Sequence, residues 1–208
     1  MNSALLPDYL SDSTRASLKA SLSSFMKSSK INSYPFTSYK TDFFLQGDIV
    51  TGVPLAYWNQ SAGEFATKEN TTCIVLSNTC DMDLKNSRIA PMDCVVAPIF
   101  SLRKFKLALK SAGINDNKIE DYIKDIQGYR ITNTFHLPLN EEYQYAPHDE
   151  YGAFVSLDKS FSIPRSILST CNTLFTLNQF FSYLFSFQMS VHFCRFHDKV
   201  DRDEHHCY

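Results

Sequence analysis

The chain has 208 residues, of which 44% are hydrophobic and 20% charged, so it carries enough apolar material to bury the core of one domain with additions. Its net charge of −2 excludes a global electrostatic attraction to nucleic acid, so any such binding requires a local basic patch. A glycine-rich phosphate loop is excluded as well, because glycine is scarce and neither GxxxxGK nor GxGxxG occurs.

The first predicted element is a helix over residues 12–29, which places Leu18 on its apolar face. Ser11 or Asp12 is the candidate N-cap, since both side chains can accept a hydrogen bond from the first helical turn. We therefore assign residues 1–40 to an N-terminal helical extension.

From Phe43 the pattern changes to short β-rich runs separated by turn residues, which favours a small barrel over a βαβ fold. A polar loop is predicted from Asn59 to Asn70. Pro98 predicts an edge position or a bulge, because proline cannot donate a hydrogen bond to a neighbouring strand. The predicted strands of this part cover residues 43–50, 51–58, 71–77 and 93–100.

A helical insertion over residues 102–127 interrupts the strands. Its first helix ends at Gly113, and its second begins at Asn115 or Asp116 and ends at Gly128. Strand-like sequence then returns up to residue 168. A last helix is predicted over residues 177–196, and Thr176 and Gln179 form a Thr-x-x-Gln capping box at its start.

Four separated segments resemble one known family in their order and spacing. They are GDIV at residues 47–50, TTCIVLS at 71–77, VVAPIFS at 95–101 and FVSLDKSFSIPRSIL at 154–168. The family is that of the MazF/PemK-like toxins, and the resemblance covers about half of the chain. It implies an SH3-like β-barrel, self-association, and a setting in a bacterial toxin–antitoxin or phage-defence system.

The predicted fold is therefore α+β, with a small SH3-like β-barrel at its centre. The barrel covers residues 41–170 and contains the helical insertion. The remaining residues, 171–208, are assigned to a C-terminal helix and a polar tail.

The segments depart from the family at the positions that matter for its ribonuclease activity. Family ribonucleases use an arginine at the head of the second strand, which supplies charge to the scissile phosphate, and a hydroxyl residue in a PITS sequence. Here Thr71 takes the place of the arginine and Phe100 that of the hydroxyl residue, with Ser101 next to it. Because threonine carries no positive charge at pH 7, this departure favours a binding or regulatory module over a ribonuclease.

The alternative is a divergent endonuclease, acting on RNA or DNA, with a relocated site. A thiol beside a carboxylate is a poor nucleophile, so Cys80 requires a histidine or arginine from elsewhere, and the C-terminal helix offers both. In the simpler interpretation Asp81 or Asn78 caps a turn, Cys80 is a small buried residue, and Arg195 pairs with Asp81. The candidate catalytic residues of the endonuclease are Ser77, Cys80, Asp81, His192 and Arg195.

A basic helix face in the insertion is the candidate patch for a phosphate backbone, and aromatic residues near it offer a stacking surface. A solvated helix face is the alternative explanation of the same charges. The candidate nucleic-acid-binding residues are Arg103, Lys104, Lys106, Lys110 and Trp58.

No metal or cofactor is predicted. Cys194 and His197 stand at a spacing that a helix can present to zinc, but the tail around them is highly charged and ends the chain.

Six cysteines without a CxxC pair and the lack of a signal-peptide pattern predict a cytoplasmic protein with reduced thiols. No membrane span is expected, because Asn178 and Gln188 interrupt the longest apolar stretch. The expected partner is a protein or a second copy of the chain, with RNA or DNA as a further candidate.

Overall fold

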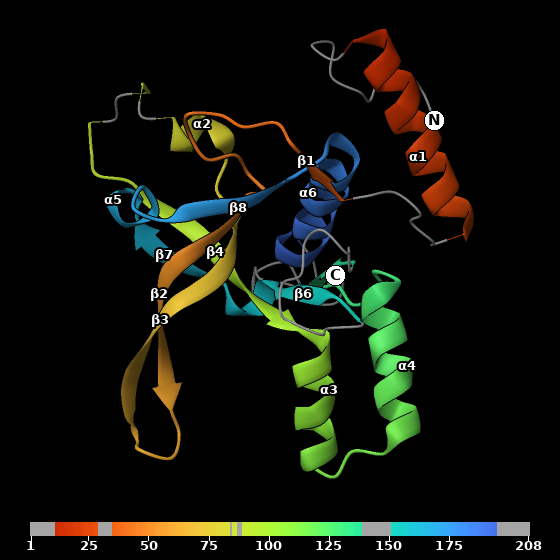
Figure 1. Ribbon diagram of the computed structural model, residues 1–208, viewed down its shortest axis with the longest axis vertical. Coiled ribbons are helices and arrows are strands. Elements are labelled where there is room, and N and C mark those ends of the chain that lie inside the picture. Colours follow the sequence, from red (N-terminus) through yellow and green to blue (C-terminus); the bar gives the residue numbers. More distant parts are fainter. Residues whose placement is uncertain (1–10, 29–34, 84, 87–88, 139–150, 195–208) are drawn as a thin grey trace, which may run out of the picture.

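The computed structural model describes residues 11–28, 35–83, 85–86, 89–138 and 151–194, and Figure 1 shows their arrangement. Helices and one antiparallel sheet of eight strands make up this part of the chain, which confirms the predicted α+β class. The described strands are β1 Phe36–Thr37, β2 Ile49–Asn59, β3 Glu64–Val75, β4 Asp93–Ser101, β5 Thr134–Leu137, β6 Ala153–Ser156, β7 Phe161–Pro164 and β8 Asn172–Leu177. The described helices are α1 Asp12–Ser28, α2 Thr79–Met82, α3 Leu102–Ser111, α4 Asp116–Gln127, η2 Leu157–Lys159, α5 Arg165–Leu168 and α6 Gln179–Phe193. None of these helices is both long enough and apolar enough to cross a membrane.

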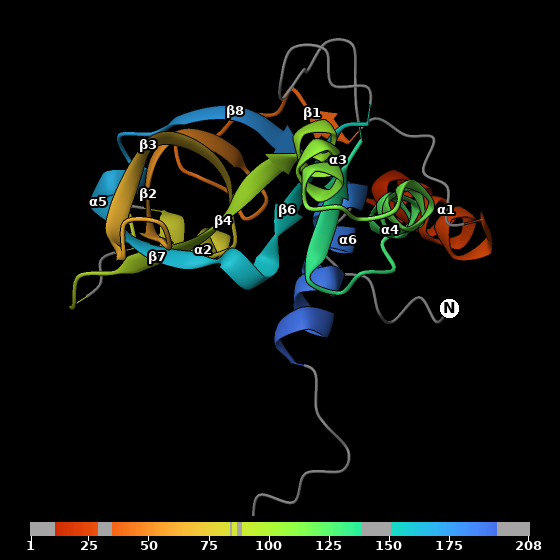
Figure 2. The same cartoon turned by 90° about the horizontal axis from the view of Figure 1, so that it is seen from below.

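The four segments of the family resemblance lie in one sheet. β2 pairs with β3 through Ile49 and Ile74, and β3 pairs with β4 through Val75 and Val96. The strand order is β1-β8-β2-β3-β4-β6-β5, and β7 is attached to β4. Figure 2 shows β8, β2, β3, β4 and β7 curling around a shared core. The sheet is nevertheless not closed, because the described pairings leave β1 and β5 as its two ends.

The central strands are buried on both faces, which explains why their sequences are continuously apolar rather than alternating. One face holds Val50, Cys73 and Val96 against residues of α2, β7 and α5. The opposite face holds Ile49 and Ile74 against α6, β5 and β6. Burying a large apolar side chain contributes about 1.5–3 kcal/mol, so these two clusters supply most of the energy that holds the sheet in its curled shape.

The region predicted as a polar loop from Asn59 to Asn70 is mostly strand. β3 begins at Glu64, so the connection between β2 and β3 is a short turn in which Gly63 adopts a φ of +68°. Across the strands, Trp58 and Phe65 form an edge-to-face ring pair with centroids 5.2 Å apart. Such cross-strand aromatic pairs stabilise a hairpin.

Pro98 lies in a central strand rather than at an edge. On one side it pairs with Cys73 of β3. On the other side β4 pairs with β7 up to Val96 and with β6 from Ile99 onward. The proline therefore occupies the position where β4 exchanges one neighbour for the other, and its missing N–H is tolerated there.

The helices begin and end close to the predicted residues. Ser11 caps α1 by accepting a hydrogen bond from the Thr14 amide (3.2 Å), and Asn115 caps α4. The last helix starts later than predicted, because Thr176 and Leu177 belong to β8. Its cap is Asn178, whose side chain accepts from the Phe181 amide at 3.0 Å.

Candidate nucleic-acid interface

A groove of about 390 Å³ lies between β3, the end of β4 and α3. In Figure 1 the outer parts of β3 and α3 project from the sheet in the same direction, and they form its two walls. We call it the β3–α3 groove. Its lining residues are Lys68, Asn70, Thr71, Thr72, Ile99, Phe100, Ser101, Lys104, Phe105, Ala108 and Ala153.

The β3 wall is shaped by a β-bulge. Between the pairs Val53–Thr71 and Leu55–Lys68, β3 contains one residue more than β2. Asn70 lies in this interval with a φ of +55°, a left-handed conformation that asparagine tolerates better than most residues. Bulges of this kind bend a strand and redirect its side chains, and here both Lys68 and the buried Thr71 line the groove.

The α3 wall is anchored by its first turn. The hydroxyl of Ser101 caps the helix by accepting from the Lys104 amide at 3.2 Å, and Leu102 is fully buried. One turn on, the ring of Phe105 contacts that of Phe154 with centroids 5.1 Å apart. Because its base is fixed in this way, α3 holds Lys104 at a defined position in the groove.

The charge of the groove comes from Lys68 and Lys104. The other described lining residues are neutral, so the groove contains two ammonium groups and no carboxylate. The start of α3 adds the partial positive charge of a helix N-terminus. The arrangement therefore favours an anion.

The remaining lysines of the predicted basic face are turned toward α4. Lys110 forms an ion pair with Asp116 at 2.9 Å. Lys106 forms an ion pair with Glu120, hydrogen bonds to the Tyr151 hydroxyl at 2.8 Å, and lies 4.6 Å from the centre of that ring. The hydrogen bond to Glu120, followed by that to Tyr151, raises the pKa of Lys106 above its ordinary value. Both lysines thus join α3 to α4. Among the predicted nucleic-acid-binding residues, Lys104 alone lines the groove, and Arg103 is exposed on α3.

Trp58 lies on the other face of the hairpin from Lys68. Leu55 pairs with Lys68 and Trp58 pairs with Phe65 in a regular register, and residues three apart in a strand point to opposite faces. Tyr57, two residues from Leu55, is on the same face as Lys68. Of the two aromatic residues near the predicted patch, Tyr57 is therefore the one on the groove side.

The turn after β3, the predicted alternative site, is held by hydrogen bonds to its main chain and hydroxyls. The Ser77 hydroxyl accepts from the Val95 amide at 2.8 Å, which ties the end of β3 to β4. Thr79 accepts from the Gln46 amide at 3.1 Å. The carbonyl of Asp81 accepts from the Arg165 guanidinium at 3.3 Å. Ser77, Cys80 and Asp81 thus lie in one short segment that runs from the end of β3 into α2.

The remaining predicted members of that site come from outside this segment, and of these His192 alone lies within the described residues. Cys80 is exposed, whereas the simpler interpretation expected it to be buried. His192 lies in the last turn of α6 with its ring against Phe193 (4.7 Å), and both views show that end of α6 away from α2. Arg195 falls outside the described residues.

Three further cysteines lie in the core between the curled strands. Burial raises the pKa of the Cys73 thiol to about 12, with a smaller effect of the nearby Cys171. Burial also raises the pKa values of Cys94 and Cys171. These thiols are accordingly protonated and unreactive in the folded chain.

The described residues contain no group of three or more side chains suited to holding a metal ion. Cys194 is exposed at the end of α6. His197, the second residue of the zinc spacing considered above, lies outside the described part of the chain.

Sequence reasoning missed Lys68, Asn70 and Phe105 as groove residues. The mostly polar run from Glu64 to Asn70 predicts a loop at Lys68, whereas the structure has a strand there. The one local signal was the aromatic residue Phe65, which alternates with small and polar residues as strand residues do.

Comparisons of the chain with protein-family models, with curated proteins and with solved structures gave no match.

Proposed function

We propose that this chain is a divergent MazF/PemK-like protein that binds nucleic acid through the β3–α3 groove without cleaving it, within a bacterial toxin–antitoxin or phage-defence system. In this proposal the curled sheet is derived from an SH3-like barrel, and the groove takes the place of the ribonuclease site. The proposal extends to a cytoplasmic location.

One observation carries it. Thr71 and the pair Phe100 and Ser101 are 29 or more residues apart in sequence, and they line the same groove. The family resemblance assigns these positions to the catalytic arginine and to the catalytic hydroxyl. Positive charge is supplied there by Lys68 and Lys104 instead, which supports retention of phosphate binding after loss of the arginine.

The chemistry of the lining residues favours binding over cleavage. Hydrolysis of a phosphodiester needs groups that accept and donate a proton near neutral pH, for which histidine or a perturbed carboxylate is suited. The described lining residues are lysine, asparagine, threonine, serine and apolar residues. Lysine ammonium groups neutralise phosphates and position a backbone, which gives affinity that depends strongly on salt.

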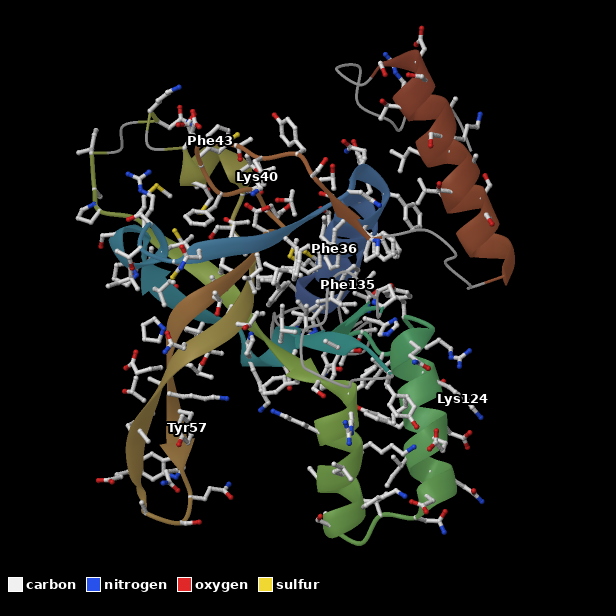
Figure 3. All side chains as sticks on the ribbon, viewed as in Figure 1. Phe36, Lys40, Phe43, Tyr57, Lys124 and Phe135 are labelled. Carbon is white, nitrogen blue, oxygen red and sulfur yellow. The ribbon has the colours of Figure 1, made fainter. Side chains whose placement is uncertain are left out.

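The test is binding of fluorescent RNA and DNA of about 20 nucleotides, single-stranded and duplex, measured by anisotropy at several salt concentrations. The variant is Lys68→Ala combined with Lys104→Ala. The control is Lys124→Ala, which removes a lysine from the side of α4 that faces away from α3 (Figure 3) and is only loosely paired with Asp121 at 3.7 Å.

We expect the double variant to bind at least about tenfold more weakly, with the slope of log K against log salt reduced by roughly 2, and the control to change little. Equal losses of affinity in the double variant and in the control would refute the groove as the binding site. Cleavage of the RNA or DNA that Asp81→Ala abolishes would refute a binding module and would favour the endonuclease alternative.

A further inference from the structure

The outer part of the β2–β3 hairpin extends beyond the rest of the sheet (Figure 1). We call it the distal ribbon; it consists of residues 55–59 of β2 and 64–68 of β3. Among the described residues, β8 pairs with β2 only at residues 49–51, and β4 pairs with β3 only at residues 73–75. Both outer edges of the distal ribbon are therefore without a neighbouring strand. A two-stranded ribbon with no further layer is only marginally stable in water.

The distal ribbon also exposes aromatic side chains. Tyr57, Trp58 and Phe65 are 45%, 53% and 77% exposed. Figure 3 shows Tyr57 on this projecting part of the chain, far from the helices. Several exposed aromatic residues on one protrusion are typical of an interaction surface.

The two edges of the ribbon differ in charge. The β3 edge carries Glu64 and Lys68, and charged residues of this kind prevent further strands from pairing with an edge. The β2 edge from Leu55 to Trp58 carries no charge. This edge is therefore the one that can accept another strand.

We propose that the β2 edge pairs with the β2 edge of a second copy of the chain, antiparallel and about a two-fold axis at Tyr57. Identical edges meet across such an axis, and the same faces of both ribbons lie on the same side. Tyr57 is then opposite its own equivalent, and Ala56 is opposite Trp58 of the partner subunit. The result is a continuous four-stranded sheet.

This register is self-complementary in size and charge. The large indole of each Trp58 lies opposite the small side chain of an Ala56. Two bulky side chains therefore do not clash at these positions, and two small ones do not leave a gap. The charged residues Glu64 and Lys68 are on the outer strands, where like charges from the two copies do not meet. The edge-to-face pairs of Trp58 and Phe65 from both copies come together on one face.

The proposal is independent of nucleic-acid binding, because Lys68 and Lys104 are outside the new strand pairing. The contact is short, so its area is small compared with the roughly 1,200–2,000 Å² of standard interfaces. We therefore expect a dimer that dissociates on dilution.

The test measures the mass of the full chain by sedimentation velocity from about 1 µM to about 300 µM, together with the fluorescence of Trp58. Trp58 is the single tryptophan of the chain, so its emission reports directly on this surface. The disrupting variant is Tyr57→Lys, which places two ammonium groups opposite each other at the axis. The matched control is Ala66→Lys, which adds the same charge in the same cross-strand row but on the outer strand.

We expect the mass to rise toward two chains and the Trp58 emission to shift to shorter wavelength over the same concentration range. Tyr57→Lys is expected to move this transition at least about tenfold higher in concentration, and Ala66→Lys less than about threefold. A chain that stays monomeric throughout would overturn the proposal. So would a dimer that Tyr57→Lys leaves unchanged, or one whose formation leaves the Trp58 emission constant, since either result places the contact elsewhere.

Discussion

Lowering the pH is expected to weaken the fold through one buried imidazole, that of His136 on β5. His136 is 8% exposed, and its Nε2 atom has the Tyr151 carbonyl at 3.4 Å as a distant partner. Burial lowers the pKa of His136 from 6.5 to about 4, an effect that the contact with Tyr151 only partly offsets. The folded chain therefore keeps this imidazole neutral at a pH where the unfolded chain already binds a proton.

The magnitude follows from the difference between the two pKa values. Since the unfolded state binds more protons between about pH 6.5 and about pH 4, the free energy of unfolding falls as the pH falls through this window. Each pKa unit corresponds to about 1.4 kcal/mol, which gives a full loss of about 3 kcal/mol below pH 4 and about 2 kcal/mol between pH 7 and pH 5. In urea this smaller loss corresponds to a midpoint lower by roughly 1 M.

The assay is urea unfolding at about pH 7 and about pH 5, followed by circular dichroism, for the parent chain and for His136→Gln. Glutamine does not titrate, so the variant is expected to lose about 2 kcal/mol less than the parent over this interval. Burial raises the pKa of Asp48, whose protonation stabilises the fold as the pH falls, so only the difference between parent and variant isolates His136. His192→Gln, in the last turn of α6, is the control and should keep the full parental loss. Equal losses in the parent and in His136→Gln would refute the reasoning.

Three further predictions concern the core. Phe135→Ala should lower the free energy of unfolding by about 3–5 kcal/mol, because the fully buried ring packs against Phe185 with centroids 5.0 Å apart. Thermal unfolding checks this loss, and Phe65→Ala is the control that should cost far less, because Phe65 is 77% exposed. Gln188→Leu should cost about 2–4 kcal/mol in urea unfolding, because the Gln188 amide donates to two main-chain carbonyls at 2.9 and 3.2 Å that would lose this partner, and a loss below 0.5 kcal/mol would contradict this assignment. A thiol reagent followed by mass spectrometry should label Cys80 in the folded chain and Cys73 only after unfolding, because Cys73 is fully buried with its pKa raised to about 12; equal labelling rates would argue against the buried position.

The helices and strands that are indicated by a pattern of neighbouring residues could be predicted from the sequence. The insertion helices carry an apolar stripe with helical spacing, and their caps at Ser101 and Asn115 are side-chain hydrogen bonds within two or three residues. The central strands were recognisable because burial on both faces makes their sequences continuously apolar. The start of β3 and all of β8 escaped detection, since Glu64–Asn70 is polar and Asn172–Leu177 runs directly into α6.

The candidate site was also predictable only in part. The four family-like segments point to Thr71, Phe100 and Ser101, the basic run points to Lys104, and all four residues line the groove. The sequence could not reveal that Lys106 and Lys110 are bound by acidic residues of α4, because the partner of a charge depends on which helix packs beside it. Nor could it reveal that Trp58 and Lys68 face opposite ways, which follows from the register of β2 and β3.

The sequence by itself determined the secondary structure of most elements and the apolar residues of the sheet, because hydrophobic period and capping act over one or two turns of the chain. The tertiary structure alone decided the groove and the distal ribbon. Lys68 and Lys104 line the same groove because a bulge redirects β3 and because Phe105 fixes α3 against β6. Contacts of this kind depend on long-range packing, for which no pattern in a single stretch of sequence is specific.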